Sequence, residues 1–172
     1  MDNAHRNTTA MARVGLLALL LLALGLGGCA PAHIAPEPLP TLSQGARNPV
    51  VAAARSLTGA PYKWGGESPQ TGFDCSGLTW WAYRQVGVDL PRVSYDQYEV
   101  GHPVGRRDIG PGDLVFFRLR GNRKNMHVGI ATDNDSFIHS PSSGGRVREE
   151  PFDTPYWREH YIGARRVLRS GG

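Results

Sequence analysis

The distribution of hydrophobic and polar residues divides the chain into three parts. Residues 14–26 form an apolar run that only glycine interrupts, and residues 30–47 are rich in proline, alanine and small polar residues. From residue 48 to residue 168, apolar and polar positions alternate with the periods that are typical of helices and strands. We therefore expect one compact domain that follows an N-terminal extension.

The beginning of this domain predicts a short helix over residues 50–57. Asn48 is a favourable N-cap, Pro49 suits the first helical position, and Gly59 is a favourable terminating residue. The following residues, 60–66, contain proline, glycine and two bulky aromatic side chains. They are interpreted as a loop.

A second helix is predicted to begin at Cys75 and to end before Gly87. Asp74 stands where an N-cap belongs. Four apolar residues follow at helical spacing: Leu78, Trp81, Ala82 and Val86. This pattern indicates a helix that buries one face and presents Cys75 in its first turn.

The second half of the domain predicts strands. A Pro-Gly-Asp turn leads into an apolar run at 114–117, and further strand-like runs at 126–132 and 136–140 are separated by a short polar turn. The last run, 162–168, is expected to close the sheet. Because helices come first and consecutive strands follow, the sequence predicts an α+β domain with segregated layers.

The apolar run near the N-terminus is interpreted as part of a signal peptide. Arg6 and Arg13 precede it, and it is shorter than the ~20 residues that a spanning helix needs. It ends in Leu26-Gly27-Gly28-Cys29, which resembles the lipobox of bacterial lipoproteins. This resemblance implies cleavage before Cys29 and lipidation of its thiol, with an ordinary signal peptide as the alternative. Ala30, in place of Asp, favours the outer membrane.

These patterns predict four segments. Residues 1–28 are the lipoprotein signal peptide, residues 29–47 the lipidated cysteine and an extended proline-rich tether, residues 48–168 the folded domain and residues 169–172 a tail. We expect the chain to be anchored in the inner leaflet of the outer membrane and to face the periplasm of a Gram-negative bacterium.

The charge of the chain adds little to this picture. Its 172 residues carry a formal net charge of +4, which would suit an anionic partner, but the basic residues are scattered. The densest cluster, within residues 118–124, lies in a predicted loop without the aromatic groups or module that nucleic-acid recognition usually adds. We expect no nucleic-acid partner.

The two cysteines lead to the candidate chemistry. An exported chain lies in an oxidising compartment, where paired cysteines normally form disulfides. If Cys29 carries lipid, Cys75 is left single. Its position at a helix N-terminus, where unpaired backbone N–H groups lower a thiol pKa, suits a nucleophile. A buried, inert cysteine is the alternative.

A thiol nucleophile needs a base, and four histidines lie in the predicted domain. His102, between Gly and Pro, is interpreted as a turn residue, and His160 as a surface or packing group. His127 begins a predicted strand, where the small residues on its face are expected to leave a groove. His139 lies on the adjoining strand and shares a face with Phe137, so hairpin pairing would place the two histidines side by side.

From the residues alone, strand packing and catalysis remain equally open for His127 and His139. A metal site formed by Asp113 with these two histidines is a further alternative. It would leave Cys75 unexplained, and we therefore favour Cys75 as nucleophile, His127 as base and His139 as the group that orients it. No metal or cofactor is expected.

Six segments match, in order and spacing, the successive motifs of a known family: Pro61–Gly66, Phe73–Leu78, Leu90–Ser94, Pro111–Phe117, His127–Ile130 and Phe137–His139. The chain resembles the NlpC-type cell-wall cysteine peptidases over residues 48–168, and it looks closest to lipoprotein murein endopeptidases of the MepS and NlpC kind. The resemblance implies a papain-like α+β fold, in which N-terminal helices carrying the nucleophile pack on a mainly antiparallel sheet.

The resemblance also implies roles for individual residues. Cys75 matches the nucleophile, His127 the base and His139 the third, orienting residue of a Cys-His-His triad. Tyr62 matches a tyrosine whose hydroxyl assists the oxyanion together with the Cys75 backbone N–H.

Two more positions match the substrate groove of the family, Ser76 and Arg92. The guanidinium of Arg92 is expected to bind a substrate carboxylate. Trp64 is interpreted as a core aromatic residue. The basic segment 118–125 corresponds to a variable insertion of the family.

We expect a lipid-anchored peptidoglycan endopeptidase that hydrolyses an amide bond through a thioester. Its partners are peptidoglycan stem peptides and, through Cys29, a membrane. Cleavage between D-glutamate and diaminopimelate and cleavage of the cross-link both remain open. The alternatives are a catalytically silent wall-binding lipoprotein and a papain-like amidase or acyltransferase.

Overall fold

The structure, a computed structural model, describes residues 48–119, 126–133, 135–143 and 145–168. The predicted signal peptide, Cys29, the tether, most of the basic insertion and the tail lie outside the described residues. Within the described part of the chain, no helix is both long and apolar enough to cross a membrane.

Two capped helices lead the domain, as predicted. α3 (Pro49–Arg55) begins after Asn48, whose side chain accepts two backbone N–H groups of the first turn. α4 (Cys75–Arg84) begins after Asp74, whose carboxylate accepts the N–H of Gly77 at 2.6 Å. Each cap is worth about 1 kcal/mol because it satisfies N–H groups that have no partner within the helix.

A small hairpin lies between these helices in the sequence. β1 (Glu67–Ser68) pairs with β2 (Gly72–Phe73), and the predicted loop before it reaches back so that Tyr62 forms a bridge with Phe73. Phe73 is fully buried. The hairpin therefore fixes the chain that enters α4 and, with it, the position of Cys75.

The rest of the domain is a six-stranded sheet in the order β3-β8-β4-β5-β6-β7, with every neighbouring pair antiparallel. Its strands are β3 (His102–Val104), β4 (Leu114–Arg118), β5 (Met126–Ala131), β6 (Ser136–His139), β7 (Arg148–Pro151) and β8 (Tyr161–Arg166). Helices precede an antiparallel sheet, which confirms the predicted α+β class.

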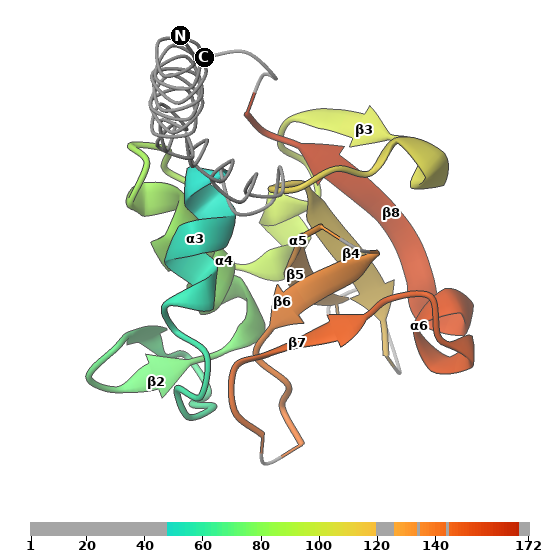
Figure 1. Cartoon of the computed structure of the whole chain (residues 1–172). Coiled ribbons are helices and arrows are strands. Elements are labelled where there is room, and N and C mark those ends of the chain that lie inside the picture. The colour runs from blue at the N-terminus through green and yellow to red at the C-terminus, as the bar shows by residue number, and fades with distance from the viewer. Residues whose placement is uncertain (1–47, 120–125, 134, 144, 169–172) are drawn as a thin grey trace, which may run out of the picture. The chain divides into compact units, whose positions relative to one another are not determined.

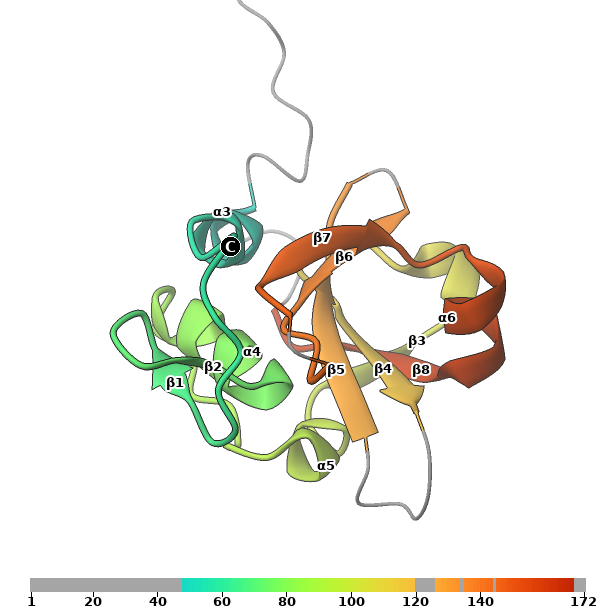
Figure 2. The same ribbon diagram turned by 90° about the horizontal axis from the view of Figure 1, so that it is seen from below.

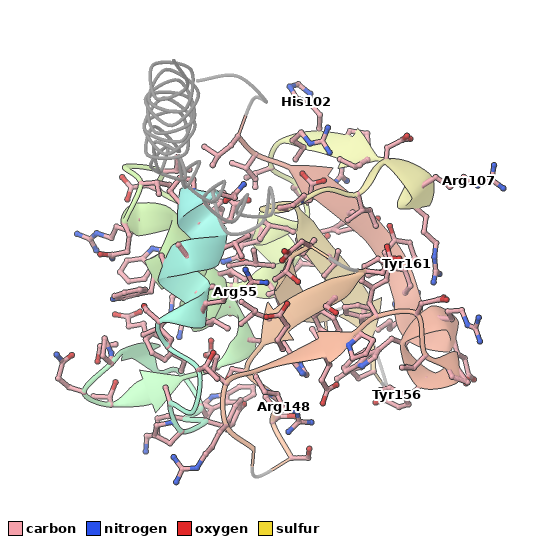
Figure 3. The ribbon with its side chains drawn as sticks, in the orientation of Figure 1. Arg55, His102, Arg107, Arg148, Tyr156 and Tyr161 are labelled. Atoms are coloured by element: carbon pink, nitrogen blue, oxygen red, sulfur yellow. The ribbon has the colours of Figure 1, made fainter. Side chains whose placement is uncertain are left out.

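Three features of the sheet differ from the prediction. The last strand, β8, lies inside the sheet between β3 and β4. The two edge strands, β3 and β7, were not predicted, because proline and exposed charges conceal the strand period. His102 was predicted to be a turn residue, but it lies in β3, where its exposed side chain points away from the domain (Figure 3).

α3 and α4 cover one face of the sheet, and α4 packs against β5 (Figures 1 and 2). One apolar cluster fills this interface and includes Val50, Leu78, Phe116, Val128 and Ile130, all of which are fully buried. Burying side chains of this size contributes about 1.5–3 kcal/mol each. The interface therefore holds the N-terminus of α4 firmly against the sheet.

A second apolar cluster covers the opposite face and includes Phe117, Ala131, Phe137 and Trp157. It fills the space that the small residues beside His127 were predicted to leave as a groove. A Cβ added at Gly129 would lie 2.6 Å from Cδ2 of Phe137. The small residue at this position admits an aromatic ring of the core, and the prediction of a groove there is wrong.

Three short helical segments complete the domain: α5 (Ser94–Gln97), the 3₁₀ helix η1 (Arg106–Asp108) and α6 (Pro155–His160). α6 begins after Thr154, whose hydroxyl caps the N–H of Trp157. It carries the Trp157 ring into the second cluster, close to both histidines of interest.

Charged side chains fasten α3 to the sheet. Arg55 reaches from α3 to Asp133 at 2.5 Å and to Glu149 on β7 at 3.0 Å (Figure 3). These pairs are partly exposed, and each contributes less than about 1 kcal/mol. They fix the orientation of α3 more than they stabilise the domain.

Candidate active site

Cys75 is the first residue of α4 and is partly buried. Burial raises the pKa of its thiol to about 11, and the backbone N–H groups of Val128, Ser76 and Cys75 itself oppose this rise because they stabilise the thiolate. The negative charge of Asp74 acts in the same direction as burial. The thiol therefore rests as a neutral S–H group beside β5.

The thiol lies in a cleft of about 720 Å³. The helix end supplies Asp74, Cys75 and Ser76, the preceding loop Tyr62, Trp64 and Gly65, and the sheet Met126, His127 and Ser140; Arg92, Val93, Ser94, Leu119 and Ser142 complete the lining. A cleft of this size accommodates a short peptide.

Two buried hydroxyl groups fix the helix end against the sheet. Ser140, directly after β6, donates to the carbonyl of Phe73 at 2.7 Å, and Ser94 donates to the carbonyl of Met126 at 2.7 Å. Phe73 lies two residues before Cys75, and Met126 lies one residue before His127. The first hydrogen bond therefore ties the chain that enters α4 to the end of β6, and the second ties α5 to the start of β5.

His127 and His139 meet through their rings. The register of β5 and β6 sets Gly129 against His139, so the two histidines meet diagonally across the strands, and Nε2 of His127 lies 2.8 Å from Nδ1 of His139. His127 is 5% exposed and His139 is fully buried. The predicted pairing of the two histidines is confirmed, and it leaves Nδ1 of His127 as the ring nitrogen available to the Cys75 thiol.

Both imidazoles are neutral at physiological pH. Burial lowers the pKa of His127 to about 3, and the charge that His139 would carry lowers it further. Burial and the positive charge of Arg148 lower the pKa of His139 to about 3. The cleft therefore holds a neutral thiol and the neutral imidazole of His127, which His139 contacts from behind.

Tyr62 lies at the mouth of the cleft near the thiol. Burial raises the pKa of its phenol, as do the charge that Cys75 would carry as a thiolate and the charge of Asp74. Tyr62 is therefore a neutral hydrogen-bond donor that lines the same cleft as the thiol.

Trp64 was interpreted as a core aromatic residue, and this interpretation is wrong. Its side chain lines the cleft and is 84% exposed. The following residue, Gly65, has a φ of +69°, and its N–H donates to the carboxylate of Asp74 at 2.9 Å. The tight turn directs the indole outward, away from the interface between the helices and the sheet.

Arg92 also lines the cleft, but its guanidinium is occupied by the protein. It donates to both carboxylate oxygens of Asp74 at 3.0 and 2.9 Å, to Glu67 at 2.8 Å and to Ser76 at 3.1 Å. These contacts do not support the predicted role in binding a substrate carboxylate, because both terminal nitrogens of the Arg92 guanidinium already bind the carboxylate of Asp74. Arg92 instead holds the carboxylate that caps α4.

Ser76 lies within the same network and is 6% exposed. Its hydroxyl donates to Asp74 at 3.3 Å and accepts from Arg92. It contributes to the floor of the cleft and supports Asp74 from the side opposite Gly65.

The part of the chain that forms the cleft matches a known protein family. The family model described as NlpC/P60 family matches residues 59–166, which contain every described residue of the cleft. The chain belongs to the NlpC/P60 family. Its fold is the papain-like α+β fold of that family, as predicted.

Relatives of the NlpC/P60 family differ in how much of their length this chain spans. It is 44% identical to murein DD-endopeptidase MepH of Escherichia coli K12 over 113 residues, which are 64% of this chain and 42% of MepH. It is 36% identical to the probable endopeptidase NlpC of the same organism over 154 residues, which are 87% of this chain and 97% of NlpC. The chain thus spans less than half of MepH and nearly all of NlpC.

A solved structure supports the same assignment. An NLP/P60 family protein of Staphylococcus aureus, described as similar to a lipoprotein, superposes with a TM-score of 0.65 at 32% identity. The match covers 88% of this chain and 48% of that protein.

The other polar residues that the sequence suggested are placed away from the thiol of this NlpC/P60 domain. Asp113 pairs with Arg166 at 2.7 Å and accepts the N–H of Gly110. Among the described residues, no group of three or more His, Cys, Asp or Glu side chains is arranged to hold a metal ion. His160, at the end of α6, is partly exposed and interacts through Nδ1 with the carbonyl of Tyr156.

Sequence reasoning missed the supporting residues of the NlpC/P60 cleft. Asp74 was identified as a helix cap, but its second partner, Arg92, is eighteen residues away. Ser94 and Ser140 were not singled out, because a single serine carries no periodic signal. Ser94 ends one of the segments that resemble the family, whereas Ser140 lies one residue beyond another.

Proposed function

We propose that this chain is a peptidoglycan endopeptidase that hydrolyses amide bonds of murein stem peptides or of their cross-links with Cys75 as nucleophile. The observation that carries the proposal is the thiol at the N-terminus of α4, which shares a cleft with the hydrogen-bonded pair His127 and His139. The relative MepH, which is named a murein DD-endopeptidase, supports peptidoglycan as the substrate, and the relative NlpC, which is named a probable endopeptidase, supports the reaction type.

The proposed reaction is an acyl transfer in two steps. As sulfur of Cys75 attacks the carbonyl carbon, its proton passes to Nδ1 of His127, and the backbone N–H of Cys75 with the phenol of Tyr62 stabilises the oxyanion. His127 then protonates the leaving amine as the C–N bond breaks, which leaves a thioester. Water attacks the thioester with His127 as base, and the acid product and the free thiol are released.

His139 acts as the orienting residue of the proposed Cys-His-His triad. Its Nδ1 accepts the Nε2 proton of His127, so that Nδ1 of His127 stays unprotonated and directed to the cleft. The imidazolium that forms during attack keeps this hydrogen bond. The pair therefore sets the tautomer and the ring orientation of the base.

The decisive experiment is digestion of purified sacculi, followed by mass analysis of the products. We expect wild-type protein to release peptide fragments and Cys75→Ala to release none, while His102→Ala, which changes an exposed edge residue, remains active. Release of fragments by Cys75→Ala at the wild-type rate would refute the proposed nucleophile. The product masses decide between a bond within the stem, a cross-link and an amidase that separates peptide from glycan.

We further propose that Cys29 carries the lipid anchor and that the enzyme acts from the inner leaflet of the outer membrane. The lipobox-like sequence supports lipidation of Cys29, as does the Staphylococcus aureus relative that is described as similar to a lipoprotein, and Ala30 supports the outer membrane. Several acyl chains anchor a protein firmly, whereas one chain binds only marginally. In cells fed a labelled fatty acid, wild-type protein should incorporate label and Cys29→Ala should not; label in Cys29→Ala would contradict the anchor.

A further inference from the structure

A carboxylate lies on the far side of His139 from His127. Glu150, on the edge strand β7, places Oε2 3.5 Å from Nε2 of His139. Among the described residues this nitrogen, which is buried, has no hydrogen-bond partner. A row of side chains therefore leads from the cleft to the edge of the sheet, in the order Cys75, His127, His139 and Glu150.

Glu150 is held in this position from two directions. The indole N–H of Trp157 donates to Oε2 at 3.0 Å, and Nε of Arg148 donates to Oε1. The Glu150 side chain is 26% exposed. A second hollow of about 1040 Å³, lined by both histidines, Arg148, Glu150 and Trp157, opens on this side of the pair. The carboxylate is thus fixed at the border between the buried histidine and solvent.

The tautomers of the two histidines follow from the hydrogen bond between them. For His127 to accept the thiol proton at Nδ1, its own proton has to be on Nε2, which then donates to Nδ1 of His139. Nδ1 of His139 has to be unprotonated to accept it. The single proton of a neutral His139 is therefore on Nε2, the nitrogen that faces Glu150.

We propose that Glu150 is a positioning residue of the active site, which holds His139 in the Nε2–H tautomer and thereby keeps Nδ1 of His127 free to accept the Cys75 proton. This inference rests on the proposed function. The carboxylate transfers no proton in this scheme; the proton that leaves sulfur stays on His127 until it passes to the leaving amine. Carboxylate partners of histidine fix tautomers in the same way at other sites.

The charges around the pair agree with this role. Three elements pack around His139. They are β5 with His127, β7 with Arg148 and Glu150, and α6 with the uncharged Trp157. The positive charge of Arg148 opposes protonation of His139, whereas the negative charge of Glu150 raises the pKa of His127. The arrangement keeps His139 neutral and favours the transient imidazolium on His127.

The test compares Glu150→Gln, Glu150→Asp and a matched control, Glu149→Gln. Glu149 is on the same strand, but its carboxylate is bound by Arg55 and Thr132. Because Oε2 of Glu150 faces both Trp157 and His139, a glutamine at position 150 either keeps a neutral, weaker acceptor there or turns its NH₂ group toward Nε2 of His139. In both cases it favours Nε2–H on His139 less than the carboxylate does. We expect kcat on muropeptides to fall about 10- to 100-fold with KM unchanged, by analogy with lost histidine-carboxylate contacts elsewhere. Glu150→Asp should retain more activity, and Glu149→Gln should equal wild type.

The second measurement reads the tautomer directly. Nitrogen-15 NMR of wild-type protein should show His139 protonated at Nε2, and Glu150→Gln should shift its proton to Nδ1. Wild-type protein with His139 protonated at Nδ1, or a fully active Glu150→Gln, would overturn the role of Glu150. Neither result would affect the proposed nucleophile, which Cys75→Ala tests independently.

Discussion

His127 and His139 cross nearly at right angles, with an interplanar angle of 85° and 2.8 Å between Nε2 of the first ring and Nδ1 of the second. Neighbouring strands hold both rings, and the Trp157 ring stacks on His127 at an interplanar angle of 18°. The imidazole of His127 therefore cannot rotate without disrupting the second apolar cluster. The same packing buries both imidazoles, and this burial is the structural basis for the pH dependence that we expect.

The free energy of unfolding should fall as the pH drops below about 6.5, the ordinary pKa of histidine. Burial lowers the pKa of His127 and His139 to about 3 in the folded domain, so the unfolded chain binds more protons between these values. At pH 4.5 one such histidine costs about 3 kcal/mol. Urea unfolding at pH 7.0, 5.5 and 4.5 measures this slope.

His127→Gln provides the control for this slope. It removes one of the two histidines. The slope of the free energy of unfolding against pH should therefore be smaller than in wild type by the contribution of up to one proton taken up on unfolding. An identical slope in both proteins would show that His127 is protonated in the folded domain as easily as in the unfolded chain. The raised pKa of Cys75 acts at the other end, where stability should fall above pH 9.

Trp64→Ala should leave the stability of the domain unchanged and weaken binding of substrate. The indole is 84% exposed, and exposed substitutions usually change the free energy of unfolding by less than about 0.5 kcal/mol. Because the ring lines the cleft, its removal should raise KM several-fold with little change in kcat. Thermal melts and steady-state kinetics on muropeptides measure the two effects.

Phe117→Ala is the matched control, because it truncates an aromatic residue that is fully buried in the second cluster. Such truncations cost about 3–5 kcal/mol. A drop in stability for Trp64→Ala as large as that for Phe117→Ala would show that the indole packs against the domain in solution.

The sequence predicted those parts of the fold and site that carry local signals. Asn48 and Asp74 predicted where the two helices begin. The single Cys75, together with two histidines on adjacent predicted strands, indicated a thiol nucleophile with a histidine base. What it missed depends on long-range geometry. The exposure of Trp64 follows from the turn at Gly65, and the partners of Arg92 come from two separate segments, residues 66–67 and 74–76.

The edge strands were missed for a related reason. β7 carries Arg148, Glu149 and Glu150 in succession, a run of charges that reads as a loop when its partner strand is unknown. Only the pairing with β6 shows that Glu150 is near His139 while Glu149 turns to Arg55. Side-chain partners across a sheet are set by register, which a single sequence does not specify.

Arg92→Ala should reduce kcat and stability, and it should leave KM nearly unchanged. Without the guanidinium, the largely buried carboxylate of Asp74 keeps its charge near the thiol and raises the pKa of Cys75 further. Losing partners of a buried polar group costs about 1–3 kcal/mol. If Arg92 instead bound a substrate carboxylate, KM would rise and stability would stay constant.

Arg92→Lys separates these possibilities further. An ammonium restores the positive charge but not the two parallel hydrogen bonds to Asp74. We expect the alkylation rate of Cys75 by iodoacetamide at pH 8 to follow the order wild type, Arg92→Lys, Arg92→Ala. Equal rates in all three proteins would show that Arg92 does not influence the thiol.

Gly129→Ala should destabilise the domain and impair catalysis without touching a reacting group. The added Cβ would lie 2.6 Å from Cδ2 of Phe137 and 2.8 Å from the carbonyl oxygen of Ile138, so β5 and β6 have to separate. Overpacking of this kind costs about 1–3 kcal/mol. Because His127 and His139 are on these two strands, their hydrogen bond should lengthen and kcat should fall.

The control for this change is Gly110→Ala, whose added Cβ would have ordinary contacts, 3.6 Å from Nη2 of Arg166 and 4.0 Å from Asp113. It should leave both the melting temperature and kcat near wild type. If Gly129→Ala lost stability but kept full kcat, the spacing of β5 and β6 would not control the histidine pair. Loss of both, with Gly110→Ala unaffected, would show that the fit of Phe137 over Gly129 keeps the proposed base and its orienting residue in register.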